Sequence, residues 1–369
     1  LDSVLANCDV RAVGVVVVDD ASPEPALAEY LDALSRSGSI TLLKNETNRG
    51  FVESVNRGMS LHRDRDVVLL NSDTEVAAGW LERLAACAYR EPDIGTVTPF
   101  SNNATICSYP FDGWAGGVPG TLGLSRLDRL IATTNAGRHI ELPTAVGFCM
   151  YIRRASLDAV GNFDVERFGR GYGEENDFSL RARAVGWRSV LAADVFVFHQ
   201  GSVSFGTERT GLQRAGLQRL LEAHPRYLDA LGDFSRRDPV ACVRRAIDDA
   251  RYALGGDERD SVICEQRTRR GATPGVSGPV QLHFTHSWDG GTNRWIADFC
   301  AYDTVRRNLV LRSVSNRDFA AWRIELCDPQ FLDAPLMQWD LEKPIRATDT
   351  LNLEYRLILD EIVATFGVQ

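Results

Sequence analysis

Short runs of apolar, largely β-branched residues recur through the first half of this 369-residue chain, each followed by a segment with helical spacing. The run AVGVVVVDD at residues 12–20 is too short for a buried helix and is typical of a buried strand. SITLLKNE (39–46) and DVVLLNSD (66–73) repeat it, with helical segments between them at 24–34 and 50–62. This alternation predicts an α/β fold with a mostly parallel sheet flanked by helices.

The pattern continues to about residue 200. We expect one more helix in GWLERLAACAYRE and further strands in GTVTPF, TAVGFCMYIRR and SVLAADVFVFH, at residues 79–91, 95–100, 144–154 and 189–199.

Four segments follow from this pattern. The α/β domain takes residues 1–206, and a helical extension interrupted near Pro225 and Pro239 takes 207–264. Residues 265–279 are rich in Gly, Pro, Ser and Arg, which is typical of a linker. A partial second α/β unit occupies 280–369. It opens with the strand VQLHFTH, continues through the glycine turn SWDGGTN, and enters a helix at Arg294.

Composition narrows the class of protein. The formal net charge of −9 argues against a broad nucleic-acid surface, although one basic pocket for a phosphorylated ligand remains compatible with it. No apolar run approaches the roughly 20 residues that a membrane span needs, and no signal peptide is visible. Eight cysteines without CxxC pairs indicate neither a zinc site nor a disulfide scaffold. We therefore expect a cytoplasmic protein.

The two ends of the sequence look cut. LDSVLANCDV opens inside an amphipathic helix, and the final helix ends where another strand would be expected. We interpret the sequence as the middle of a longer polypeptide.

Acidic residues follow two of the predicted strands. Asp19 and Asp20 end the first strand, and Asp73 follows the third strand across Asn71 and Ser72. Ligands of open parallel sheets bind just beyond the carboxyl ends of strands. Carboxylate and phosphate oxygens suit Mg²⁺ or Mn²⁺, so Asp73 is a candidate metal ligand. The structural alternative is that these residues belong to turns and helix caps.

The stretch GYGEENDFSL concentrates three acids where a glycine-rich segment becomes a helix. Phe178, Ala182 and Val185 fall on one face of that helix, so Glu174 and Glu175 lie at its first turn. A helix N-terminus favours anions by roughly 0.3–1 kcal/mol, which is one explanation. The other is that a carboxylate facing a cleft takes a proton from a hydroxyl nucleophile. Both readings remain open on the residues alone.

His199 ends the apolar run VFVFH. A single histidine at the end of a strand is usually structural. Beside a divalent cation its neutral imidazole becomes a candidate ligand.

Six ordered motifs over about 200 residues resemble the family 2 glycosyltransferases of GT-A fold, especially the bacterial rhamnosyltransferase-like branch that builds surface polysaccharides. The resemblance extends from Leu1 to about residue 260. The motifs are VVVVDDAS, NETNRGFVESVNRGM, DVVLLNSDTEVAAGWLERL, AVGFCMYIRRASLDAVGNFDVERF, GYGEENDFSLRARAVGW and VFVFHQGSVSFG.

The resemblance implies an inverting, metal-dependent transfer of a hexosyl or deoxyhexosyl group from a nucleoside-diphosphate sugar to an acceptor hydroxyl. Asp19 or Asp20 corresponds to the acid that contacts the nucleotide base and ribose. Asn48 and Asn71 are expected to bind the donor beside it. Asn71 stands where many relatives carry the first Asp of a D-x-D element, so Asp73 is left as that element's metal ligand.

The remaining site residues also follow from the resemblance. Glu175 corresponds to the catalytic base, Glu174 is its acidic neighbour, and Asp177 is expected to help orient the acceptor. His199 corresponds to a histidine that in some relatives completes the metal site. The cofactor is then Mg²⁺ or Mn²⁺.

The implied partners are a nucleoside-diphosphate sugar and a glycan or lipid-linked glycan, with no nucleic acid. A lipid-linked acceptor implies peripheral association with the inner face of the membrane. Sugar and acceptor selection is expected in the loop SNNATICSYPFDGWAGG, where Tyr109 and Trp114 either stack on sugar rings or anchor the loop.

Relatives begin with a strand of the type V-x-I-I-I-P-x-Y-N, and this sequence starts just after it. A non-catalytic binding or scaffold module of a larger protein is therefore the main alternative. A nucleotidyltransferase is less favoured, because the phosphate-cradling glycine-rich loop that it needs near the first strand is not seen.

The tail QLHFTHSWDGGTNRWIADF resembles the opening strand, glycine loop and helix of a GT-B glycosyltransferase N-terminal lobe. We expect no separate activity from this incomplete segment.

Overall fold

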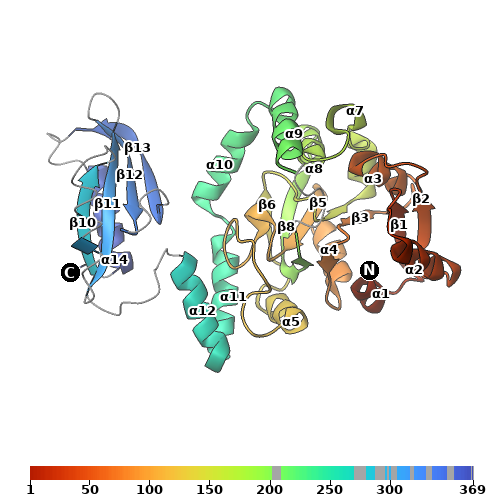
Figure 1. Ribbon diagram of the computed structural model, residues 1–369, viewed down its shortest axis with the longest axis horizontal. Coiled ribbons are helices and arrows are strands. Elements are labelled where there is room, and N and C mark those ends of the chain that lie inside the picture. The colour runs from red at the N-terminus through yellow and green to blue at the C-terminus, as the bar shows by residue number, and fades with distance from the viewer. Residues whose placement is uncertain are drawn as a thin grey trace. The chain divides into compact units, whose positions relative to one another are not determined.

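The computed structural model describes residues 1–201, 209–269, 280–286, 296, 299–300, 306–315, 320–329, 335–346, 353–366 and 368. The chain divides into two compact units, Leu1–Val262 and Ile263–Gln369 (Figure 1). Each unit has its own hydrophobic core. Among the described residues, no helix combines the length and the hydropathy needed to cross a bilayer.

A five-stranded sheet forms the centre of the first unit, in the order β3-β7-β5-β8-β6. Strands β5 and β8 are parallel, and the other three pairings are antiparallel. Three strands, β3, β5 and β8, therefore run in the same direction. The bounds are β3 Val67–Leu70, β5 Ile94–Phe100, β6 His139–Leu142, β7 Cys149–Ile152 and β8 Arg188–Phe196.

The predicted α/β class is confirmed, but the pairing in the central sheet is more antiparallel than expected. Strand β7 enters between β3 and β5 and runs against both. The sequence pattern did not reveal this, because an apolar run reports burial and not strand direction.

Two smaller sheets accompany the central one. Strands β1 (Val16–Asp19) and β2 (Thr41–Lys44) pair in parallel. The two-residue strands β4 (Thr74–Glu75) and β9 (Phe198–His199) pair antiparallel and place Thr74 opposite His199. The strands predicted at residues 12–20 and 39–46 are thus present.

Helices cover the sheets and share the core with the strands. Trp80 and Leu84 of α4 are buried in one core cluster, and Phe178 and Ala182 of α8 in another. Val185 was predicted on the same apolar face as Phe178 but is 59% exposed, because helix α8 ends one residue before it. The bounds are α1 Asp2–Asn7, α2 Pro25–Arg36, α3 Phe51–Met59, α4 Trp80–Ala88, η1 Thr105–Cys107, α5 Leu124–Thr134, α6 Arg154–Val160, α7 Val165–Phe168 and α8 Glu174–Ala184.

The helical extension consists of α9 (Arg209–Ala223), α10 (Tyr227–Arg237), α11 (Ala241–Ala253) and α12 (Gly256–Arg269). Its first two breaks coincide with the two prolines noted in the sequence. Phe234, Val240, Val243 and Ile247 belong to the same core cluster as the central sheet. Helix α12 continues into the residues predicted as a linker, and residues 270–279 lie outside the described part of the chain.

A buried ionic network joins helices α11 and α12 to the loop after β5. Arg251 pairs with Glu258 and also donates to the Tyr109 hydroxyl, which in turn donates to Asp248 at 2.7 Å. Arg244 donates at 2.9 Å to each of two loop carbonyls, those of Ile106 and Ser108. The extension is therefore built into the first unit.

The second unit is a four-stranded sheet in the order β10-β11-β12-β13. Strands β10 and β11 are parallel, whereas β11, β12 and β13 are antiparallel. A doubly wound lobe would continue in parallel, so the GT-B-like pattern does not extend beyond β11. The predicted glycine turn and the start of its helix lie outside the described residues. The bounds are β10 Val280–His286, β11 Arg307–Ser315, β12 Ala321–Cys327, β13 Met337–Ile345 and α14 Leu353–Phe366.

Candidate active site

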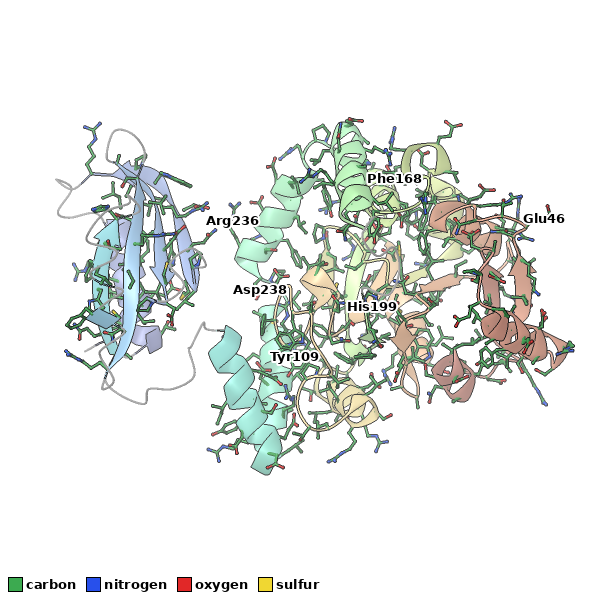
Figure 2. All side chains as sticks on the ribbon, viewed as in Figure 1. Glu46, Tyr109, Phe168, His199, Arg236 and Asp238 are labelled. Carbon is green, nitrogen blue, oxygen red and sulfur yellow. The ribbon has the colours of Figure 1, made fainter. Side chains whose placement is uncertain are left out.

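Asp73 and His199 meet at the carboxyl edge of the central sheet. Strands β4 and β9 bring the two residues together, and His199 Nε2 lies 3.5 Å from Asp73 Oδ1. The other carboxylate oxygen accepts a hydrogen bond from the backbone N–H of Gly201 at 2.9 Å. Both side chains keep a partly exposed edge, at 17% for Asp73 and 15% for His199. Figure 2 shows His199 near the middle of the first unit.

The imidazole of His199 is held in one orientation. Its Nδ1 lies 2.7 Å from the backbone carbonyl of Asn103, which only accepts hydrogen bonds, so Nδ1 carries a hydrogen, and the neutral form of the ring has its lone pair on Nε2, on the side of Asp73. Phe148 stacks on the ring, with centroids 5.2 Å apart. This is the tautomer that a metal-binding Nε2 requires.

Asn102 was not identified from the sequence. Its buried side-chain amide donates to the His199 carbonyl at 2.9 Å and accepts from the His199 N–H at 2.8 Å. A further bond to the Gly116 carbonyl measures 2.6 Å. The available signal was the pair Asn102–Asn103 directly after a strand that ends at the same sheet edge as Asp73.

These donors fit a hard or borderline divalent cation in part. One carboxylate oxygen and one imidazole nitrogen converge, which suits Mn²⁺ when oxygens of a diphosphate and water complete the coordination. The described residues contain no group of three or more His, Cys, Asp or Glu side chains that could hold a metal by themselves. Oxygens of the nucleoside-diphosphate sugar and of water are therefore needed to complete any such metal site.

Glu174 and Glu175 begin helix α8, after the left-handed Gly173 with φ of 103°. Glu174 is 5% exposed and Glu175 is partly buried. One carboxyl oxygen of each, Oε2, is buried without a hydrogen-bond partner among the described residues. Each of the two side chains thus keeps one oxygen that can accept a hydrogen bond or a proton.

Burial sets the protonation of this pair. It raises the pKa of Glu174 well above the ordinary value, and the neighbouring charge of Glu175 raises it further. Burial also raises the pKa of Glu175, while the backbone N–H groups at the start of α8, including that of Gly173, oppose the rise. Glu174 is therefore the better proton holder, and Glu175 is the one that ionises first.

Asp177 lies in the same turn but has a different environment. Its side chain is fully buried and accepts from Arg181 Nε at 2.7 Å on one oxygen and from His224 Nε2 at 2.9 Å on the other. Both oxygens are therefore engaged with protein groups. This arrangement does not favour the direct acceptor contact expected for Asp177.

The segment Ala145–Phe148 connects the two acidic centres. The backbone carbonyl of Phe148 accepts from the N–H of Asn71 at 2.9 Å, and its ring stacks on His199. One residue earlier, a Cβ placed on Gly147 would lie 3.2 Å from Cγ of Glu175. Asn71, His199 and Glu175 therefore border the same segment, at the carboxyl ends of β3 and β8.

The structure separates the two acids after β1. Asp20 accepts from the backbone N–H groups of Arg49 at 2.8 Å and Gly50 at 2.9 Å, and from the Asn45 amide at 2.7 Å. Burial opposes its ionisation, but these hydrogen bonds outweigh burial and lower the pKa of Asp20. Asp20 thus shapes the loop before α3, and its carboxylate is engaged by these hydrogen bonds.

Asp19 and Asn48 are the other two predicted donor-binding residues of this region. Asp19 accepts from the Ser22 N–H at 2.9 Å, and Asn48 is exposed in the loop that Asp20 shapes. That loop reaches the glycine-rich segment before α8, because a Cβ on Gly50 would meet Cα of Arg170 at 3.0 Å. No described contact brings Asp19 or Asn48 into the Asp73–His199 pair.

The two aromatic residues predicted to stack on sugars or anchor the loop after β5 differ in their surroundings. Tyr109 is fully buried in the ionic network with Arg251 and Asp248, so it anchors the loop (Figure 2). Trp114 is partly exposed and packs edge-on against Phe111, with centroids 5.1 Å apart. Only Trp114 keeps surface for a sugar ring.

Comparison with known proteins finds a family model that matches part of the first unit. Residues 1–161 match a glycosyltransferase model. The family that this model describes is glycosyl transferase family 2, which confirms over these residues the resemblance seen in the motifs.

Among curated proteins, the uncharacterized protein y4gI of Sinorhizobium fredii (strain NBRC 101917 / NGR234) is 27% identical over 231 residues. The match covers 59% of this chain and 24% of the relative, so the chain spans about a quarter of that protein's length.

Three solved structures are similar to part of the chain. GalNAc-T7 with UDP, GalNAc and Mn²⁺ has a TM-score of 0.43 and 18% identity, covering 64% of this chain and 51% of that one. The mannosyltransferase PcManGT from Pyrobaculum calidifontis with GDP-Man and Mn²⁺ has a TM-score of 0.43 and 17% identity, covering 71% of this chain and 72% of that one. S. aureus TarS 1-349 has a TM-score of 0.37 and 17% identity, covering 74% of this chain and 87% of that one.

Proposed function

We propose that this protein transfers a sugar from a nucleoside-diphosphate donor to an acceptor hydroxyl with inversion at the anomeric carbon. The observation that carries the proposal is the meeting of two centres at the segment Ala145–Phe148. One is the Asp73–His199 pair, and the other is the buried Glu174–Glu175 pair. The first suits a metal-bound diphosphate and the second suits proton removal.

Each side chain then has a role. Glu175, ionised, accepts the proton of the attacking hydroxyl as its oxygen bonds to the anomeric carbon. The bond from that carbon to the diphosphate oxygen breaks, and its electron pair leaves with the nucleoside diphosphate. Asp73 and His199 would hold a divalent cation, Mn²⁺ or Mg²⁺, which would supply charge stabilisation to the departing diphosphate.

The neighbours of these residues tune the chemistry. Glu174 keeps its proton and can donate a hydrogen bond to the acceptor or to Glu175. Asn71 and Asp19 are proposed donor contacts, with Asn48 beside them. The hexosyl or deoxyhexosyl nature of the group, an acceptor that is a glycan or lipid-linked glycan, and a place in bacterial surface polysaccharide assembly are further parts of the proposal. So is a cytoplasmic site at the inner face of the membrane.

A panel of nucleotide sugars with Mn²⁺ tests the proposal. Thermal shift identifies the donor, and release of nucleoside diphosphate with and without acceptor alcohols measures turnover. Proton NMR of the product then reports the anomeric configuration. We expect stabilisation by at least one donor, Mn²⁺-dependent release and an inverted product. A retained configuration would contradict the mechanism.

The non-catalytic alternative has its own outcome. If a donor stabilises the protein but no nucleoside diphosphate is released, in the wild type as in a variant with Glu175 replaced, a binding or scaffold module is favoured.

A further inference from the structure

The corner between helices α9 and α10 lies against the first turn of α8. His224 follows the end of α9, and its Nε2 lies 2.9 Å from Asp177 Oδ1. A carboxylate oxygen only accepts, so His224 donates here. The N–H of Tyr227 bonds to the carbonyl of His224 at 3.0 Å, which fixes the start of α10 to this contact.

Asp177 also contacts residues of other elements. Besides His224, it faces Arg181 Nε at 2.7 Å and Arg167 at 3.7 Å. Arg181 also donates to the carbonyl of Val160 at 2.9 Å and to that of Asn162 at 3.1 Å. The first turn of α8 is therefore tied to α7, to the end of α6 and to the corner after α9.

Helix α9 also packs directly on the glycine-rich segment before α8. A Cβ placed on Gly216 would lie 2.1 Å from the backbone oxygen of Tyr172, so no side chain fits there. From the other side, a Cβ on Gly173 would lie 3.3 Å from the Gly216 carbonyl. The extension thus fixes the backbone that leads into Glu174 and Glu175.

Tyr227 forms the buried side of the corner. It is 8% exposed and shares a core cluster with Phe178 of α8. Burial raises the pKa of Tyr227 to about 12, and the negative charge of Glu175 adds to the rise. The phenol ring therefore lies in the core cluster that also holds the buried face of the helix carrying Glu175.

We infer that the corner formed by His224 and Tyr227 is a positioning part of the carboxylate site. His224 acts through Asp177 to fix the first turn of α8, and the buried Tyr227 ring shields Glu175 from water. The effect of this corner on turnover rests on the proposed transferase function. Its control of the environment of Glu174 and Glu175 does not depend on that function.

The groups that set the Glu175 environment come from several elements. Glu174 and the N–H groups of the α8 terminus lie on its own helix, and Tyr227 lies on α10. The guanidinium groups of Arg181 and Arg167 and the imidazole of His224 act on the turn through Asp177.

His224→Gln is the test, and His139→Gln is the matched control. His139 makes a similar contact with Glu91 at 3.1 Å and has similar exposure, at 18% against 22%. In His224→Gln we expect turnover to fall between about 10-fold and 100-fold, because the turn that carries the base loosens. Donor KM should stay nearly unchanged. The acid limb of the rate profile should move to lower pH as water reaches Glu175. In His139→Gln the turnover, the donor KM and the acid limb should all stay as in wild type.

Tyr227 gives a second pair of variants. Tyr227→Phe keeps the ring and should keep the wild-type acid limb. Tyr227→Leu removes the ring, which lets water approach Glu175, and should shift that limb to lower pH. Equal profiles for Tyr227→Leu and wild type would overturn the role of the ring.

An infrared carboxyl titration of the apo-protein separates this inference from the proposed function. Glu174→Gln and Glu175→Gln assign the bands of the pair. We expect the Glu175 band to titrate at lower pH in His224→Gln than in wild type, whether or not the protein turns over any donor. An unchanged titration in a folded His224→Gln protein would overturn the inference.

Discussion

Two adjacent glutamates at one helix terminus receive different protonation states from their surroundings. Glu174 is the more deeply buried of the pair and also experiences the charge of Glu175. Glu175 is opposed by the N–H groups of the α8 terminus. The sequence alone offered either residue as an acid or a base, and only burial and backbone geometry separate them.

Glu175→Gln should reduce transfer by about 100-fold to 10,000-fold, because an amide cannot accept the proton of the attacking hydroxyl. Donor affinity measured by calorimetry should stay close to wild type, since a base acts on the chemical step. Glu174→Gln is the matched variant. It mimics the protonated acid and should lose far less activity. Equal losses in both variants would contradict the division of roles.

Glu174 also makes stability depend on pH. Its pKa is higher in the folded protein than in the unfolded chain, so the folded state binds the proton more tightly. That contribution is fully present below the unfolded pKa and is lost as pH rises through the folded one. We expect the melting temperature of wild type to fall over that range and Glu174→Gln to show a smaller fall. Parallel melting curves against pH would disprove this.

Asp73→Ala should weaken Mn²⁺-dependent donor binding by about 10-fold or more, because the only described carboxylate of the proposed metal site is lost. Calorimetric titration of the donor with and without Mn²⁺ measures the effect. Asp32→Ala is the control, since Asp32 forms an exposed ion pair with Lys44 at 2.6 Å. A Mn²⁺ dependence that survives in Asp73→Ala would remove the assignment.

At the level of helices and strands, the sequence predicted positions better than directions. The apolar runs ending at Asp19, Lys44 and Leu70 are strands, as expected. The proximity of Asp73 and His199 could be predicted, because both residues follow strands whose ends share one edge of the sheet. Strand direction and long-range partners are not written in the local pattern. The contact of Asp177 with His224, 47 residues away, is of that kind.

The close approach of α9 to the glycine-rich segment gives a prediction for this element. Gly216→Ala adds a methyl group that would meet the Tyr172 carbonyl, so we expect a loss of about 1–3 kcal/mol in the free energy of unfolding. Gly211→Ala, on the same helix with no described atom within 4 Å of its Cβ position, is the control. It should be neutral or stabilise by up to about 1 kcal/mol. Urea unfolding of the two proteins makes the comparison.

At the level of the whole molecule, the hydrophobic clusters follow the two units. The clusters around the central sheet contain only residues of Leu1–Val262, and those around β11 contain only residues of Ile263–Gln369. The sequence placed the end of the first domain at residue 206, because periodicity changes there. Packing extends that domain through α11, whose Val243 and Ile247 complete the core.

A chain ending at residue 206 should therefore fail to give a stable protein. It would expose the core positions that Phe234, Val240 and Val243 cover, and it would leave Tyr109 without its partners on α11. A chain ending at Arg269 keeps both and should unfold cooperatively. Circular dichroism on heating distinguishes the two, and a cooperative transition in the shorter chain would contradict the structural boundary.

The unpartnered Oε2 atoms of Glu174 and Glu175 have a consequence for inhibition. An acceptor analogue with a primary amine in place of its reactive hydroxyl would bring a cation to two buried oxygens that lack donors. Such a compound would bind as the ammonium ion while the pair gives up a proton to solvent, so its affinity would strengthen with rising pH until the amine itself loses its charge.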